Sequence, residues 1–233
     1  MLTVSTGFDP VLVEWLERAA LRAPRLVPRP AWDLRFTGGA LELVARAGEV
    51  RIDQPSCASY GMAVEFVVTA LHERGISAHV ATGPLPRSRV VARIEPVPSA
   101  PAGKMDHALY AALDQNDWPA LLSLPTSGCP ARSYQRDVLG LAAAAQRTTL
   151  VWDVPLTPDA TRAAIVTPTD TPEDWFRAGR GTAHVLLRAS TLGLRTALVT
   201  PSLRHSAVRE AIRRWLRPAA YPQVLLQVFQ PGC

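Results

Sequence analysis

The sequence lacks the features that assign a protein to several common classes. Its 233 residues contain no apolar run long enough to span a membrane, and the first residues show neither the basic nor the apolar region of a signal peptide. The GxSxG, HExxH, P-loop and GxGxxG patterns are all absent. We therefore expect a soluble cytoplasmic protein with no membrane partner and without one of these familiar active sites.

Cysteine and lysine are both scarce. Cys57, Cys129 and Cys233 have no CxxC spacing, and none of the five histidines has a second histidine at the spacing of metal ligands. These patterns predict three free thiols and no metal site. Lys104 is the only lysine, and the net charge of +5 comes from arginines spread along the whole chain. Because the basic residues form no stripe, we expect no nucleic-acid partner.

The apolar residues, 48% of the chain, predict an α+β fold with a sizeable core. Asp9 and Pro10 can begin a helix that ends before Pro24, and Gly38–Gly39 can join two alternating strands. The stretch from Tyr60 to Arg74 is apolar on nearly every face, which predicts a helix buried on all sides. Further strands are expected at 76–82, 89–96, 148–154, 163–168, 195–200 and 222–230, and further helices at 106–115, 132–146, 171–192 and 206–217.

The stretch PVPSAPAGK, residues 96–104, has the composition of a linker and divides the chain nearly in half. We therefore expect one half over residues 1–95 and a second half over residues 105–233. Each half offers one buried helix beside a few strands.

The second half contains an ordered set of residues that resembles a known family. A threonine-proline and an aspartate lead into a Trp-x-Arg-Ala-Gly helix, which a Gly-Leu, a short strand, a helix and a closing Tyr-Pro-Gln strand follow. This order resembles the C-terminal part of the nitroreductase-like flavoproteins, in particular the Acg subfamily. The matching residues are Thr167, Pro168, Asp170, Trp175, Arg177, Ala178, Gly179, Gly193, Leu194, Pro201, Tyr221, Pro222 and Gln223.

The first half resembles the same subfamily more loosely, through Ala23 and Pro24, then Trp32, then the Ser59–Gly61 segment. The resemblance spans residues 10–95 and 163–232. It implies a nitroreductase fold, in which helices flank a central, mainly antiparallel sheet, two long helices lie at the core and one chain contains two similar halves. The protein would then be a pseudo-dimeric monomer or a homodimer, with FMN in a groove between the halves.

The resemblance also implies a function, that of an FMN-dependent oxidoreductase. Such an enzyme takes hydride from NADH or NADPH and passes electrons to a small acceptor by a ping-pong mechanism. No catalytic side chain is assigned, because the flavin supplies the chemistry. The implied cofactor-binding residues are Arg22, Arg25 and Arg29 for the phosphate, Ser59 and Tyr60 for the groove wall, Trp32 near the ring, and the backbone amides of Arg195, Thr196 and Ala197 for the ring edge.

The chain departs from the subfamily in the proline-rich segment APRLVPRPAW, residues 23–32, which we call the strap. Arg25, Pro28 and Pro30 stand where flavin-binding relatives carry a serine, an asparagine and a glutamine, and Asp114 and Asp117 stand where cations would face a phosphate. These changes support an alternative hypothesis. In it the chain is a flavin-free or flavin-storing member of the fold that acts as a ligand-binding or interaction protein, or has a repurposed groove.

Overall fold

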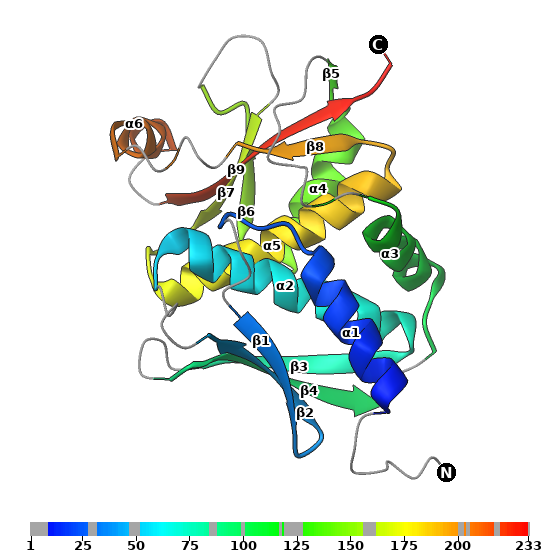
Figure 1. The fold of residues 1–233 in the computed structure, drawn as a ribbon. Coiled ribbons are helices and arrows are strands. Elements are labelled where there is room, and N and C mark those ends of the chain that lie inside the picture. Colours follow the sequence, from blue (N-terminus) through cyan, green and yellow to red (C-terminus); the bar gives the residue numbers. More distant parts are fainter. Residues whose placement is uncertain are drawn as a thin grey trace.

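The computed structural model describes residues 9–27, 32–46, 52–83, 88–98, 101–116, 118, 128–155, 162–199, 203, 206–216 and 220–232. In this part of the chain, two long helices lie between two antiparallel sheets (Figure 1). The predicted α+β class is therefore confirmed. None of the described helices combines the length and the hydrophobicity that crossing a membrane requires.

The first half builds one helix, a hairpin, a long helix and two more strands. The hairpin turns at Gly38 and Gly39, whose φ values of +56° and +81° suit a two-residue turn. The sheet has the strand order β1-β2-β4-β3, with every pair antiparallel. Its elements are α1 (Pro10–Arg22), β1 (Trp32–Thr37), β2 (Ala40–Ala45), α2 (Gln54–Glu73), β3 (Ile76–Thr82) and β4 (Val90–Pro98).

The second half repeats this plan with additions. Its strands pair in the order β6-β7-β9-β8, again all antiparallel, and β5 adds a short pairing to β9. Two further helices, α3 and α6, have no equivalent among the described residues of the first half. The elements are α3 (Lys104–Gln115), β5 (Cys129–Pro130), α4 (Ser133–Ala144), β6 (Thr149–Trp152), β7 (Arg162–Thr167), α5 (Pro172–Thr191), β8 (Arg195–Leu198), α6 (Ser206–Leu216) and β9 (Tyr221–Gln230).

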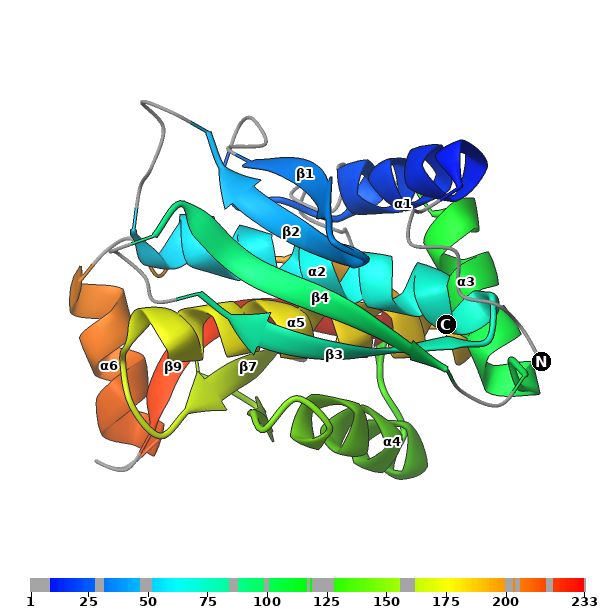
Figure 2. The same cartoon turned by 90° about the horizontal axis from the view of Figure 1, so that it is seen from below.

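The two halves correspond element by element. When Gln54, the first residue of α2, is aligned with Pro172, the first residue of α5, the two helices match over their whole length, because both have 20 residues. The same offset in residue number relates other positions of the two halves. Each ends before a glycine with positive φ, Gly75 at +68° and Gly193 at +70°. The pairing of β2 with β4 shifts register after Leu43, and the pairing of β7 with β9 shifts register after Ile165. Each of these is the fourth residue of its strand. Figure 2 shows α1 and α4 on opposite flanks of the central pair, as an internal two-fold relation requires.

The helices α2 and α5 approach each other through glycines. A Cβ atom on Gly61 would lie 2.0 Å from the carbonyl oxygen of Phe176, and one on Gly179 would lie 2.0 Å from that of Ala58. The offset between the halves takes Ala58 to Phe176 and Gly61 to Gly179, so the two contacts are reciprocal. The backbones therefore touch at a point where no side chain fits.

The long helices occupy the centre, as expected, but the described strands form two sheets and not the single central sheet that was also expected. Residues 56–71 of α2 are all buried, and so is most of α5. A helix that is apolar on every face must be covered on all sides, so the described strands form two separate sheets outside the helix pair. One large hydrophobic cluster spans both halves, and a smaller one lies under α6.

Local signals placed most element boundaries correctly. Asp9 accepts a hydrogen bond from the amide of Val11 at the start of α1, as a helix cap should. The helix α2 begins at Gln54, earlier than predicted, because Asp53 caps it and Pro55 suits its first turn. The strand β4 continues through Pro98, so the first residues of the predicted linker belong to a strand.

The prediction of three free thiols is wrong, because Cys129 is disulfide-bonded, whereas Cys57 is a free buried thiol. The short strand β5 sets Cys129 opposite Gln230, close to the end of the chain. Spacing along the sequence does not reveal this proximity, because the two strands are far apart in the chain.

We expect Gly179→Ala to destabilise the protein by about 3 kcal/mol or more, because its methyl group would collide with the backbone of α2. The matched control is Gly140→Ala in the middle of α4, where an added Cβ meets nothing within 4 Å. That change should stabilise by about 0.5–1 kcal/mol, since alanine favours the helix. Urea unfolding of both variants measures the difference. Equal effects would contradict the glycine contact.

Candidate functional site

A cavity of about 320 Å³ lies where the two halves meet, and we call it the junction cavity. The strand β3 of the first half forms one wall, and the helix α5 and the end of α4 form the others. Its volume falls in the range of pockets that hold small organic ligands. The lining residues are His79, Val80, Thr82, Ala145, Gln146, Arg147, Glu173, Phe176, Arg177 and Arg180.

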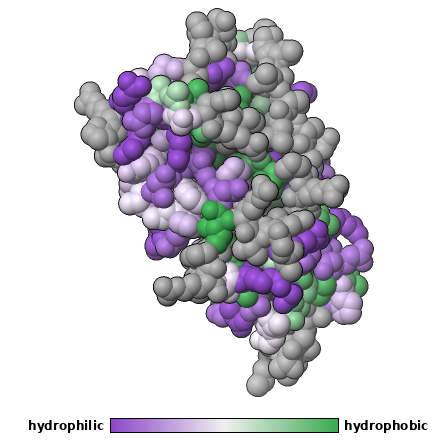
Figure 3. Space-filling view, turned by 60° about the vertical axis from the view of Figure 1, so that its left-hand side comes forward, coloured by the Kyte–Doolittle hydropathy of each residue, from purple (hydrophilic) through white to green (hydrophobic). Residues whose placement is uncertain are grey.

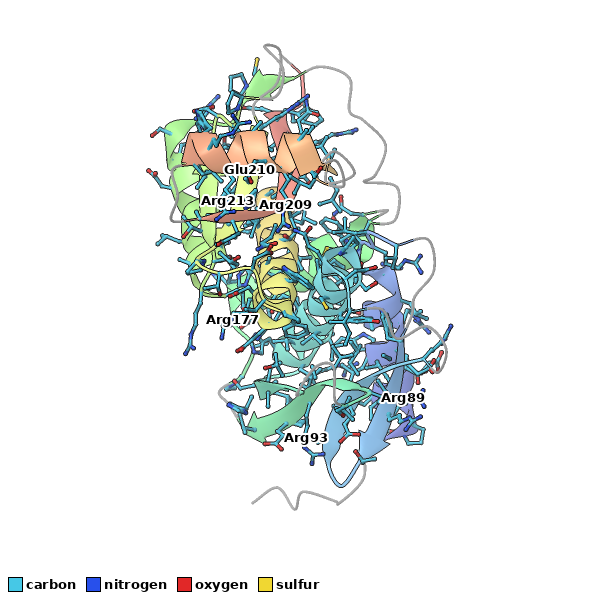
Figure 4. All side chains as sticks on the ribbon, turned by 90° about the vertical axis from the view of Figure 1, so that its left-hand side faces the viewer. Arg89, Arg93, Arg177, Arg209, Glu210 and Arg213 are labelled. Atoms are coloured by element: carbon cyan, nitrogen blue, oxygen red, sulfur yellow. The ribbon has the colours of Figure 1, made fainter. Side chains whose placement is uncertain are left out.

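Three arginines line the junction cavity. Arg177 lies on the outer side of α5 (Figure 4) and forms an ion pair with Glu173, one turn earlier on the same helix. Its Nη1 atom also lies 3.5 Å from the Asp174 carboxylate. Hydrophilic residues predominate on the described surface of this side of the molecule (Figure 3).

Arg147 follows the end of α4 in a left-handed backbone conformation, with φ at +56°. Its amide donates to the carbonyl of Ala144, and the next amide, that of Thr148, donates to Ala143. Glycine is the usual residue at such a position, because a side chain there costs free energy. The Arg147 side chain is exposed at the cavity, and no ion pair joins it to another described residue.

A buried carboxylate lies behind the cavity. Glu65 projects from α2, where it is the one acidic residue in the fully buried stretch. Its Oε2 atom accepts a hydrogen bond from Nε of Arg180 at 2.9 Å and lies 2.8 Å from Nη2 of the same guanidinium group. Its Oε1 atom accepts one from Gln146 at 3.2 Å and lies 3.1 Å from Nδ1 of His184. We call these four residues the buried cluster.

The pKa of Glu65 is lowered from its ordinary value. Burial raises that pKa, but the bonds from His184 and the charge and bonds of Arg180 outweigh burial, so the carboxylate is charged. The buried cluster therefore holds an ion pair between the two halves, with the anion on α2 and the cation on α5.

The internal two-fold relation places an equivalent position on the other side of the helix pair. The offset between the halves takes Met62 to Arg180, Phe66 to His184 and Glu65 to Ala183. Met62, Phe66 and Ala183 are all buried and apolar. The contact between α2 and α5 is therefore built in two equivalent places, with apolar side chains in one and with charged or polar side chains in the other.

Two of the predicted flavin-binding residues, Ser59 and Arg25, lie on that other, apolar side. Ser59 corresponds to Arg177, and Arg25 and Arg147 each stand two residues after a helix C-cap. The Ser59 hydroxyl accepts from the amide of Leu26 at 2.9 Å and donates to the carbonyl of Pro55 at 2.7 Å. It therefore fastens the strap to α2, and both of its hydrogen-bonding roles are in use.

The other predicted residues have varied surroundings. Arg22 pairs with the Asp114 carboxylate at 2.7 Å, and Arg25 is partly buried without an ion pair to any described residue. Trp32 and Tyr60 are buried in the core. Arg29 lies outside the described residues, as do Pro28, Pro30 and Asp117. The phosphate site of three arginines therefore stays a prediction.

The amides of Arg195, Thr196 and Ala197 belong to β8, which pairs with β9 along its length. Successive amides of a strand point to opposite sides. At least one of the three therefore points toward β9, and at most two can face a ligand. The three amides therefore cannot all donate to one ligand, as the resemblance implied.

The residues that carry the family resemblance form a structural network at the start of α5. Gln223 donates to Thr167 at 2.8 Å and to Asp170 at 3.2 Å. Trp175 donates to the same Asp170 oxygen at 2.6 Å, and Arg209 reaches it from α6, also at 2.6 Å (Figure 4). Burial alone would raise the pKa of Asp170. The hydrogen bonds from Arg209, Trp175 and Gln223 outweigh burial, so the pKa is lower than its ordinary value.

These placements bear on the cofactor that the resemblance implies. Among the residues expected to bind FMN, Ser59 and Arg22 already have partners, and at most two of the three β8 amides can face a ligand. The junction cavity fits an anionic group better, since three arginines line it. Among the described residues, no group of three histidine, cysteine or acidic side chains gathers as a metal site would.

Sequence reasoning missed the junction cavity, although two signals pointed toward it. Glu65 is an acid within a stretch that is otherwise apolar, and Arg180 and His184 stand one helical turn apart. Only the packing of α2 against α5 brings these signals together. Comparison with models of known protein families finds no match for this chain, and no curated protein sequence matches it either.

We expect Arg180→Met to cost about 3–5 kcal/mol of stability, because it leaves the buried Glu65 carboxylate without its cation. The triple variant E65A/R180M/H184F should restore stability to at least that of the unchanged protein. The triple variant gives the Glu65 side of the helix pair the same residue types, alanine, methionine and phenylalanine, that pack at the equivalent position as Ala183, Met62 and Phe66. Chemical denaturation of both variants tests the expectation, and a triple variant as unstable as the single one would contradict the equivalence.

Stability should fall in acid. The folded-state pKa values of Glu65 and Asp170 lie below their ordinary values of 4.5 and 3.8. Each group therefore contributes stability that is present above its ordinary pKa and is lost as the pH falls through its folded-state pKa. We expect the unfolding temperature to drop between about pH 5 and pH 2, and less steeply in D170N. A profile that D170N leaves unchanged would refute the role of the Asp170 network.

Proposed function

We propose that the protein binds a small organic anion in the junction cavity. The observation that carries this proposal is the convergence of Arg147, Arg177 and Arg180 on one cavity between the halves. Guanidinium groups bind carboxylate and phosphate oxygens in paired hydrogen bonds, which are stronger than bonds between neutral groups. Phe176 and Val80 line the same cavity and offer apolar contacts to the body of the ligand.

The backbone at Arg147 supports a binding role. Arginine in a left-handed conformation costs stability that glycine would not, and such positions cluster at binding sites. The side chain held there is exposed at the cavity edge and pairs with no other described residue. A cation kept at a strained position beside a cavity is well placed to meet an incoming anion.

A second candidate function is the FMN-dependent oxidoreductase that the family resemblance implies. The observation that favours it is the internal duplication, because the cavity lies between two similar halves, where the resemblance implies a flavin groove. Under this hypothesis Arg147, Arg177 and Arg180 would hold the flavin phosphate, and the flavin would supply the redox chemistry. Titration with FMN separates the candidates, since bound flavin gives the protein a visible absorbance and raises its unfolding temperature.

We expect Arg147→Gln to weaken binding of inorganic phosphate roughly tenfold, because it removes a charge-assisted contact. Arg147→Gly should weaken binding equally and also stabilise the protein by about 1 kcal/mol, since glycine relieves the positive φ. Calorimetric titration and thermal unfolding give the two quantities.

The control for this experiment is Arg132→Gln, which removes an exposed arginine at the other end of α4. It should leave phosphate binding unchanged. Equal binding by the Arg147 variants and the unchanged protein, or no binding of phosphate or FMN by the unchanged protein, would refute the proposed site.

A further inference from the structure

We propose that the junction cavity selects small organic anions with one negative charge over those with two, and that the buried charge of Glu65 sets this preference. The inference rests on the proposed function and specifies the class of ligand, of which an organic monocarboxylate is the simplest example. Glu65 does not line the cavity but lies behind Arg180. It is therefore a positioning residue, which acts on the ligand through Arg180 and through its charge.

The charges around the cavity leave one arginine without an ionic partner. Arg180 is paired with Glu65, and Arg177 has the two carboxylates in the first turn of α5 beside it. Arg147 is the one lining arginine that forms no ion pair with a described residue. Because three carboxylates accompany the three arginines, the cavity carries little excess positive charge, and that excess is concentrated at Arg147.

Burial makes Glu65 the carboxylate that acts most strongly on a ligand. Its side chain is 4% exposed, whereas that of Glu173 is 53% exposed. Water and salt screen an exposed charge, but they screen a buried one much less. Asp174 is also buried, but it accepts hydrogen bonds from the amide and hydroxyl of Thr171 at the positive end of α5, and these offset its charge.

A fixed carboxylate disfavours a doubly charged ligand more than a singly charged one. The arginines attract a dianion twice as strongly as a monoanion at the same place, and Glu65 repels it twice as strongly. The cost of removing water from an ion rises more steeply than its charge, so a dianion needs a large excess of positive charge around it. The resident carboxylates remove most of that excess. A phosphate monoester carries about −1.5 to −2 charges, so phosphate esters, including the phosphate of a flavin, should be the weaker ligands.

The helix pair packs without a buried carboxylate at the equivalent position. There Ala183 and Met62 take the places of Glu65 and Arg180, and both are fully buried. A buried ion pair is often no more stabilising than the apolar residues that could replace it. The presence of Glu65 on the cavity side alone therefore indicates a role in what the cavity binds.

The test compares phenyl sulfate with phenyl phosphate by calorimetric titration of the full chain at about pH 8. The two ligands share a ring and a tetrahedral head with three terminal oxygens, but at this pH the sulfate carries one negative charge and the phosphate two. The unchanged protein should bind phenyl sulfate more tightly. In Glu65→Gln, which keeps an acceptor for Arg180 but removes the charge, phenyl sulfate should bind roughly threefold more tightly than before and phenyl phosphate roughly tenfold, because the free energy of interaction with a fixed charge doubles with the charge of the ligand.

The matched control is Glu173→Gln, which removes an exposed carboxylate from the wall of the same cavity. It should change the ratio of the two affinities less than Glu65→Gln does. Its effect should disappear at high salt, whereas that of Glu65→Gln should persist, because salt screens the exposed charge more than the buried one. Benzoate, a carboxylate with one charge, should respond to both variants as phenyl sulfate does.

Circular dichroism and thermal unfolding establish that each variant is folded. If Glu65→Gln does not fold, E65A/H184F replaces it, because this variant removes the same charge, keeps Arg180 and takes residue types of the equivalent position. Tighter binding of phenyl phosphate by the unchanged protein, equal gains for the two ligands in a folded Glu65 variant, or a larger change of the ratio in Glu173→Gln overturns the inference and leaves the proposed function standing. Failure of the unchanged protein and of every folded variant to bind any of these ligands overturns both.

Discussion

The contact between α2 and α5 is the constraint on which the rest of the structure depends. Gly61 and Gly179 let the two backbones touch, and each glycine faces a carbonyl oxygen of the other helix at a distance that excludes any side chain. Because the contact is reciprocal, it fixes a two-fold relation between the halves. The two sheets, the flanking helices α1 and α4, and the cavity beside α5 all take their places from this pair.

Two-fold symmetry offers the protein two equivalent positions, and the differences between them carry the functional argument. One position is closed by Met62, Phe66 and Ala183, which contribute to the core. The other holds Glu65 with Arg180 and opens into the junction cavity. A duplicated fold can thus keep one side for stability and use the other for binding, because each side needs only to pack against the same helix pair.

The residues that resemble the nitroreductase-like flavoproteins contribute mainly to this architecture. Thr167, Asp170, Trp175 and Gln223 form one hydrogen-bonded network at the start of α5, and Gly179 makes the helix contact. Such residues describe how a half is built more directly than what it binds. For this reason they agree with a duplicated α+β architecture, while the strap that was expected to hold a flavin is tied to α2 through Ser59.

The sequence by itself determined the α+β class, most helices and strands, their caps and turns, and the burial of α2, because these follow from interactions between residues close in the chain. Asp9, Thr171 and the glycines at 38, 39, 75 and 193 act within a few residues of their own positions. Only the tertiary structure decided the division into two sheets, the disulfide at Cys129 and the junction cavity. Glu65 and Arg180 are 115 residues apart in the chain, and they meet because two glycines allow their helices to touch.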